Sequence, residues 1–535
     1  MSERRRKLTI AGLVCVSSAA FVASFPPYRL PWLPWVAVVP LLLALKLTAS
    51  VTSAAGVAAV WGLLAAYGIT SWLPRAIATY YEQPFLLGLG LFVGTSILMG
   101  SFQYALFGAV YRRLGADHRP ISPLIVAAAW VVAELGRCRL FGGNPWGLIG
   151  YTLVDTTVVG TTTSSLATLA RLPVHVADLG GVYAVSFVVV AFNAALADVV
   201  FGVAQRRPRE RGAWKRIVAG LATAAILVFG ATAYGARRAS EARDGATPSE
   251  KVAIVQGNVS LGTTWRADLY GRNFEIYLQG TADTLAERPR LVLWPENAMS
   301  FFADDEPLYR MALARTLAGT ETQVLAGGPS HKGKRRPVYF NSAYLFDREA
   351  KILARYDKER LLPFAERFPF GAIAFLKRTF ERVRELTPGT RPDPLPTVVG
   401  NAGVLICNEI MFAELAIARA RAGATFLVNL SNDTWISDRV YSENHLAIGA
   451  MRAIETRRPV IRPSTSGPSA VIDATGRIVT VTKSGERAVL GASVSPSTEI
   501  TNYVRFGDYF ALVCAVAVGQ RLLSAFLRGR RKVAP

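Results

Sequence analysis

Residues 403–410 read GVLICNEI, an apolar run that ends in a thiol and a carboxylate. This run has the pattern of a buried β-strand, so it places Cys407 at a strand end. Of the four cysteines in the sequence, Cys15 and Cys514 fall inside long apolar runs, and Cys138 lies at the edge of another. Cys407 therefore has no disulfide partner and no metal-ligand cluster in its own polar segment. A lone thiol at a strand end suggests a nucleophile; a buried structural cysteine is the alternative.

The segment around Cys407, about residues 250–500, alternates short β-rich runs with helical stretches. This alternation predicts a globular α/β domain. The β-rich runs are 252–256, 291–294, 323–326, 342–346, 402–407 and 425–430, and the helical stretches are 270–287, 308–317, 413–422 and 443–456.

The rest of the chain has the composition of a membrane protein. Hydrophobic residues make up 51% of the 535 residues and charged residues only 18%, a balance that favours membrane insertion. Apolar runs long enough to span a bilayer predict seven helices before residue 240 and an eighth near the C-terminus. The expected spans are 8–24, 32–48, 51–73, 85–111, 121–137, 178–204, 216–236 and 507–527.

The net charge of +22 is concentrated in loops on one side of these spans. Basic residues gather at 4–7, 112–119, 206–216 and 528–532, which the positive-inside rule assigns to the cytoplasm. We therefore expect attraction to membrane lipid rather than to nucleic acid, and a polar domain outside the cytoplasm. The expected organisation is a transmembrane helical domain over 1–238, a linker over 239–250, a catalytic domain over 251–502, and a C-terminal transmembrane helix with a basic cytoplasmic tail over 503–535.

Two further motifs in the polar domain carry charged groups that could act with a thiol. Residues 291–297 read LVLWPEN, so Glu296 follows a strand. Residues 355–366 read RYDKERLLPFAE and contain Lys358 and Glu366. Carboxylates at strand ends are well placed for general-base catalysis. The alternatives are a solvated glutamate at a strand end and an ordinary charged surface turn.

The order Glu296, Lys358, Cys407 resembles the active site of the nitrilase, or carbon–nitrogen hydrolase, superfamily. The combination of this domain with membrane spans resembles the apolipoprotein N-acyltransferases, and the similarity covers nearly the whole chain. This resemblance implies a polytopic helical membrane domain of about eight spans joined to a nitrilase-like αββα sandwich. The stretches that carry it are VQGN (255–258), WPE (294–296), YDK (356–358), NDTW (432–435) and RAIE (452–455), with NPW (144–146) and GVYAVSF (181–187) in the membrane part.

The resemblance also implies a reaction. Cys407 would take an acyl chain from a phospholipid as a thioester and pass it to the N-terminal amine of a diacylglyceryl-cysteine apolipoprotein in a ping-pong cycle. Glu296 would be the general base, and Lys358 would stabilise the thiolate and the oxyanion. The backbone N–H of Asn408 would be a second oxyanion donor. No metal or organic cofactor is expected, and the enzyme would lie in the bacterial inner membrane with its catalytic domain in the periplasm.

Other residues match the family at positions near this site. Glu366 and Glu409 correspond to auxiliary glutamates that would orient Lys358, with structural ion pairing as the alternative. Trp265 and Trp435 correspond to positions near a lipid entrance, where an amphipathic ring is suited to the interface; core packing is the alternative.

Some loops depart from the family pattern, and these departures leave other functions open. The family has Tyr where this chain has Asn408, and a later Asn-Thr-Gly stretch appears here as STSG (464–467). A paralogue that acylates another amine is therefore one alternative. A membrane-tethered amidase or hydrolase, in which water resolves the intermediate, is a second. A non-catalytic scaffold is a third, against which the complete triad argues.

Overall fold

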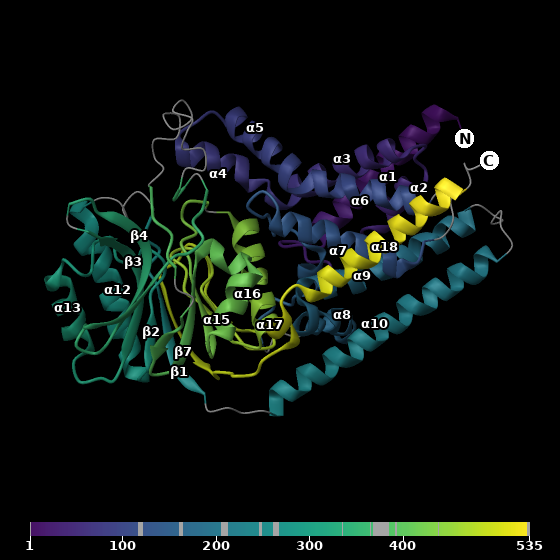
Figure 1. Cartoon of the computed structure of the whole chain (residues 1–535). Helices are drawn as coiled ribbons and strands as arrows, with labels where there is room; N and C mark the ends of the chain where they lie inside the picture. Colours follow the sequence, from purple (N-terminus) through teal and green to yellow (C-terminus); the bar gives the residue numbers. More distant parts are fainter. Residues whose placement is uncertain are drawn as a thin grey trace.

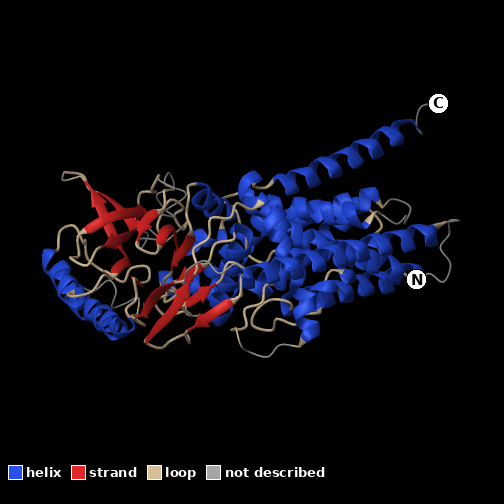
Figure 2. Ribbon diagram, turned by 90° about the horizontal axis from the view of Figure 1, so that it is seen from below, coloured by secondary structure: helices blue, strands red, loops and turns tan. Residues whose placement is uncertain are grey.

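A computed structural model of the chain describes residues 2–115, 121–159, 164–204, 212–244, 249–260, 267–333, 335–363, 365–367, 385–390, 393–436 and 438–531. It contains a helical part at one end and two packed β-sheets at the other, with both chain termini at the helical end (Figure 1; Figure 2). The main helices of the helical part are α1 (Glu3–Ala23), α2 (Val39–Lys46), α3 (Val51–Thr70), α4 (Trp72–Tyr81), α5 (Phe85–Ser96), α6 (Phe102–Leu114), α7 (Pro123–Arg139), α8 (Ser165–Arg171), α9 (Ala177–Ala204), α10 (Ala213–Asp244), α17 (Asn502–Phe506) and α18 (Tyr509–Arg531).

The membrane character of the helical part is confirmed, although the number of spans remains approximate. Within the described residues, six helical stretches are long and apolar enough to cross a bilayer. They are Glu3–Ala23, Val51–Thr70, Phe85–Leu114, Ser165–Ala204, Ala213–Glu241 and Tyr509–Arg528. The other two expected spans are a shorter apolar stretch, Leu33–Lys46, and the 17-residue helix α7. Helix α7 packs among its neighbours and buries Glu134 and Arg137.

The expected linker after the seventh span begins as helix rather than as a loop. Helix α10 continues to Asp244, well past residue 238. Ion pairs hold its last turns. The polar composition of this segment had not indicated a helix. Arg237 pairs with Glu241 four residues on, and Arg238 pairs with Asp178 of α9 at 2.8 Å. Such i,i+4 pairs and a tertiary partner stabilise a helix end that is polar all round.

The polar domain is built on two six-stranded sheets. The first has the strand order β12-β1-β2-β3-β4-β5 and the second β11-β10-β9-β8-β7-β6. Strands β1, β2 and β3 run parallel, as do β7, β8 and β9, so their carboxyl ends meet at common edges. The strands are β1 (Glu250–Gln256), β2 (Leu291–Leu293), β3 (Gln323–Lys332), β4 (Val338–Phe346), β5 (Ile352–Asp357), β6 (Leu395–Thr397), β7 (Gly400–Ile406), β8 (Phe426–Leu430), β9 (Val460–Arg462), β10 (Ala470–Ile472), β11 (Ile478–Val481) and β12 (Ala488–Val494).

The sheets pack face to face, and helices cover both outer faces (Figure 1). The layer between the sheets is apolar, with Ile254 and Leu293 of the first sheet against Val404 and Val428 of the second. Helices α12 (Tyr270–Thr284) and α13 (Pro307–Leu317) cover the first sheet. Helices α15 (Ala413–Arg421) and α16 (Arg439–Thr456) cover the second sheet and also pack against the membrane helices. The expected αββα sandwich is therefore confirmed.

Asp178, at the start of α9, joins the membrane domain to the sandwich. Its buried carboxylate accepts hydrogen bonds from Tyr234 Oη, Arg238 Nε and Arg457 Nη2, each at 2.8 Å. Arg457 caps α16 and is itself buried, and Tyr234 and Arg238 come from α10. One acidic group thus pairs with two guanidinium groups where three helices meet.

Replacing Asp178 with alanine should destabilise this junction strongly. The variant removes the ion pair of the buried Arg457, whereas Arg238 keeps Glu241 and Glu499. Breaking a buried pair in this way costs about 3–5 kcal/mol. Thermal unfolding in detergent would measure the loss. Glu241→Ala is the matched control, because Glu241 pairs with the same Arg238 but is 44% exposed, and water screens an exposed pair, so its loss should cost far less. Equal losses in the two variants would contradict the role given to Asp178.

Candidate active site

Three strand ends bring Glu296, Lys358 and Cys407 together between the two sheets. Glu296 follows β2, Lys358 follows β5, and Cys407 follows β7. Cys407 has a backbone φ of 51°, a left-handed conformation that is unusual for a residue with a side chain. The chain therefore turns sharply at the thiol. Strained conformations of this kind gather at functional sites, so the turn supports a functional role for the thiol.

Lys358 lies between two carboxylates. Its Nζ is 2.8 Å from Glu366 Oε2, 2.9 Å from Glu366 Oε1 and 3.7 Å from Glu296 Oε1. The Lys358 side chain is 1% exposed, which excludes the alternative of an ordinary charged surface turn. Burial alone lowers the pKa of Lys358, but the charges of Glu366 and Glu296 outweigh it and hold the pKa above its usual range. Lys358 is therefore a fixed cation.

The Cys407 thiol and the Glu296 carboxylate influence each other electrostatically, and both groups are buried. Burial raises the pKa of Cys407 well above its ordinary value, and the charge of Glu296 raises it further. Burial also raises the pKa of Glu296, against the opposing effect of Lys358. At neutral pH the thiol is protonated at rest. Glu296 is in position to take that proton while Lys358 balances the thiolate.

Glu409 lies at the back of the site and does not touch Lys358 through any described hydrogen bond. Its carboxylate binds backbone groups on both sides of the site, and so ties the strand that carries Cys407 to the segment that follows Lys358. The donors are Ile406 N (2.7 Å), Glu359 N (2.7 Å), Arg360 N (2.9 Å) and Tyr356 Oη (2.9 Å). This geometry favours a structural role in holding the two segments together over direct orientation of the lysine.

The remaining predicted residues fall in different surroundings. Asn408 is buried beside the nucleophile, and its Oδ1 has no hydrogen-bond partner among the described residues. Trp435 is half-buried, with its ring centroid 6.2 Å from that of Tyr80 and 6.3 Å from that of Tyr441. It belongs to an aromatic cluster where α4 meets α16. Trp265 lies outside the described residues.

Two asparagines that the sequence did not single out complete the surroundings of Glu296. Asn341 Nδ2 donates to Glu296 Oε1 at 2.7 Å, and the Asn432 backbone N–H donates to Oε2 at 3.0 Å. Asn341 also donates to Glu366 Oε1 at 2.8 Å. The motif NDTW (432–435) contained one of these residues, but no pattern in the sequence marked Asn341.

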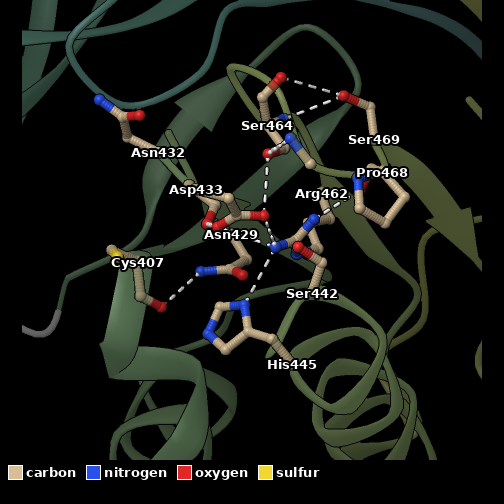
Figure 3. Close-up of polar contacts among 12 residues, drawn as sticks. Cys407, Asn429, Asn432, Asp433, Ser442, His445, Arg462, Ser464, Pro468 and Ser469 are labelled. Atoms are coloured by element: carbon tan, nitrogen blue, oxygen red, sulfur yellow. Dashed lines mark hydrogen bonds and ion pairs between the residues drawn. The ribbon is translucent and has the colours of Figure 1, made fainter. Parts of the chain in front are cut away.

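A buried polar network lies behind the nucleophile (Figure 3). Asn429 Nδ2 donates to the Cys407 carbonyl oxygen at 3.0 Å. The buried Arg462 donates to Asp433 at 2.7 Å and to His445 Nδ1 at 3.1 Å. Burial lowers the pKa of His445 to about 3, so this ring is neutral and accepts through Nδ1. This geometry gives His445 a structural role.

The sandwich and its buried Glu, Lys and Cys define a protein of the carbon–nitrogen hydrolase class, and the carbon-nitrogen hydrolase family model matches residues 251–501. A second model, the apolipoprotein N-acyltransferase N-terminal domain, matches residues 17–195. The apolipoprotein N-acyltransferase of Geobacter metallireducens is 32% identical over 96% of this chain and 95% of its own. That of Caulobacter vibrioides is 30% identical over 80% of this chain and 76% of its own.

The chain therefore belongs to the apolipoprotein N-acyltransferase family. The Saccharomyces cerevisiae protein Nit3, a solved member of the nitrilase superfamily, is 20% identical with a TM-score of 0.36 and matches 46% of this chain and 90% of its own.

Proposed function

We propose that this protein moves an acyl chain from a phospholipid, through a thioester on Cys407, to the N-terminal amine of a diacylglyceryl-cysteine apolipoprotein. The observation that carries the proposal is a buried Cys407–Glu296 pair, flanked by Lys358, in a domain whose helical layer is packed onto a membrane domain. Hydrolysis of a soluble amide would not require such a membrane domain. The family membership of the whole chain supports the same function.

In the first half-reaction, Glu296 takes the proton of the Cys407 thiol, and the thiolate attacks an ester carbonyl carbon of the phospholipid. Lys358 stabilises the negative charge on the carbonyl oxygen, together with the Asn408 backbone N–H. When the tetrahedral intermediate collapses, the ester C–O bond breaks. Protonated Glu296 returns its proton to the departing lysophospholipid oxygen, and the acyl chain remains on sulfur.

In the second half-reaction, the α-amino group of the apolipoprotein attacks the thioester carbonyl. Glu296 accepts a proton from the amine, an amide bond forms, and the C–S bond breaks. Lys358 again holds the oxyanion and then the released thiolate. We assign Glu366 to orienting Lys358, and Trp265 and Trp435 to the lipid entrance, where Trp435 belongs to an aromatic cluster shared with the membrane domain.

The charge distribution supports the orientation of the protein in the inner membrane. The basic residues at 4–7 and 528–531 lie in the outer turns of α1 and α18, which are at the same end of the molecule (Figure 1). The positive-inside rule assigns that end to the cytoplasm, so the sandwich would face the periplasm, where apolipoprotein acceptors would be met.

The thioester on Cys407 should persist in water and discharge when a diacylglyceryl peptide with a free N-terminal amine is added. A site that holds one lipid product while it awaits a second lipid substrate must exclude water. Mass spectrometry of the purified protein after incubation with phospholipid would detect the adduct. Release of fatty acid and formation of N-acyl peptide would then be measured with and without the peptide.

The matched control is the same diacylglyceryl peptide with its N-terminal amine acetylated, which should leave the adduct in place. Rapid fatty-acid release that neither peptide alters would contradict the transferase and favour the membrane-tethered hydrolase. Discharge by simple amines, but not by the diacylglyceryl peptide, would favour a paralogue with another acceptor.

A further inference from the structure

Asn341 contacts three of the groups that form the site. It lies in β4 and is 6% exposed. Its Nδ2 donates to Glu296 Oε1 at 2.7 Å and to Glu366 Oε1 at 2.8 Å, so both amide hydrogens are used. The Asn341 backbone carbonyl oxygen accepts from the Lys358 backbone N–H at 2.8 Å. The amide orientation follows from these partners, because the opposite orientation would turn the Asn341 oxygen toward two carboxylates.

The charges in the site explain why such a donor matters. Among the residues that the structure describes, Glu296 and Glu366 share a single cation, Lys358, at the end of β5. The other groups that face Glu296 are the neutral Cys407 thiol and the Asn432 backbone N–H, both uncharged. The buried Glu296 and the half-buried Glu366 around one ammonium carry an uncompensated negative charge, and a buried carboxylate such as Glu296 then tends to bind a proton. A neutral group that donates to both carboxylates opposes that tendency.

We propose that Asn341 is a positioning residue that holds Glu296 and Glu366 on either side of Lys358 and keeps Glu296 ionised, so that Glu296 is free to accept the Cys407 proton. This inference rests on the proposed roles of Glu296 and Cys407. It gives the carboxylates separate tasks: Glu366 holds the lysine through two short contacts, and Glu296 remains available as the base.

Loss of the Asn341 amide should therefore raise the pKa of Glu296. A protonated Glu296 cannot accept the thiol proton, so Cys407 would lose reactivity at pH values where the wild-type protein retains it. The alkylation rate of Cys407 falls at low pH as Glu296 binds a proton, and we call this part of the pH–rate profile the acid limb. Hydrogen bonds to charged groups are strong enough to move the acid limb to higher pH by about one unit or more. For a shift of one unit, the rate at the wild-type midpoint should fall about 5-fold, from half of its plateau to about a tenth.

The test is the rate of Cys407 alkylation by iodoacetamide as a function of pH in the full-length protein. Mass spectrometry of the Cys407 peptide separates this reaction from those of Cys15, Cys138 and Cys514. The variants are Asn341→Ala, Glu296→Gln and the double variant Asn341→Ala with Glu366→Gln. Asn401→Ala is the control, because Asn401 donates to the Gly423 carbonyl oxygen at an exposed position on β7.

We expect Asn341→Ala to shift the acid limb upward and Asn401→Ala to leave it in place. The double variant should return the limb toward the wild-type position, because one of the two like charges is gone. If the acid limb of Asn341→Ala stays at the wild-type pH, the inference is overturned, even if the rate is lower. The inference is also overturned if the double variant does not move the acid limb back toward the wild-type pH. Should Asn341→Ala not fold, the near-isosteric Asn341→Asp should shift the limb further, and an unmoved limb in that variant would overturn the inference.

Glu296→Gln separates this inference from the proposed function. If Glu296→Gln leaves the alkylation profile unchanged, the base assignment is wrong and the inference fails with it. If Glu296→Gln removes the acid limb while Asn341→Ala does not move it, the base assignment stands and only the role of Asn341 is wrong.

Discussion

Replacing Cys407 with alanine should abolish the acyl-enzyme completely. The thiol is the only group at the strand end that could form the thioester, and its loss removes the first covalent step rather than slowing it. Mass spectrometry after incubation with phospholipid should show no adduct, and N-acyl peptide should not form. The alanine should fold normally, because the surrounding apolar layer can accept a smaller side chain at one buried position.

Cys138→Ala is the control for this experiment. Cys138 is also buried, but it lies in α7 of the membrane domain, away from Glu296 and Lys358. Its variant should form the adduct as the wild-type protein does. An acyl adduct that persists in Cys407→Ala and disappears in Cys138→Ala would refute the assignment of the nucleophile.

Replacing Lys358 with methionine should reduce the rate of acyl-enzyme formation by about 100-fold or more, the usual effect of losing one oxyanion donor. Methionine keeps the length of the side chain and removes its charge. The thiolate and the oxyanion would both lose their cation. Glu366 and Glu296 would also lose their shared partner, so one of them should bind a proton at neutral pH. Single-turnover acylation of Cys407 by phospholipid measures the effect.

The control for this variant is Lys351→Met, at an exposed position before the same strand. It should acylate at the wild-type rate. Near-wild-type acylation in Lys358→Met would remove the lysine from the mechanism, whereas equal losses in both variants would point to damage to β5.

The nucleophile and the general architecture were accessible from the sequence because their signals are local. An apolar strand run that ends at Cys407, or a helix that begins after a suitable cap, depends on neighbours in the chain. Helix α16 shows the limit of such signals. It begins at Arg439, four residues before the predicted stretch, because Asp438 caps it by accepting from the Tyr441 backbone N–H at 3.1 Å.

The surroundings of Lys358 and Asn341 were not accessible in this way. Strand β5 is absent from the predicted β-rich runs, since Arg355 and Asp357 mask its pattern. In the fold these two residues pair with each other at 3.0 Å. Asparagine is unfavourable in strands, so the predicted run began at Ser342 and left Asn341 out. The structure tolerates Asn341 in β4 because carboxylates from two distant segments accept from its amide. No local pattern contains those partners.

The position of α16 has a consequence for how the protein can change over evolutionary time. This helix belongs to one continuous apolar core that includes residues of the second sheet and of the membrane helices, such as Ile454 with Ile472 and Val185. On that side the outer surface of the sandwich is apolar and is covered by the membrane helices. Released from its partner it would expose a broad apolar surface and aggregate. Exchange of whole domains between distant relatives should yield poorly soluble hybrids, so the two halves are expected to be inherited, and to diverge, as a single unit.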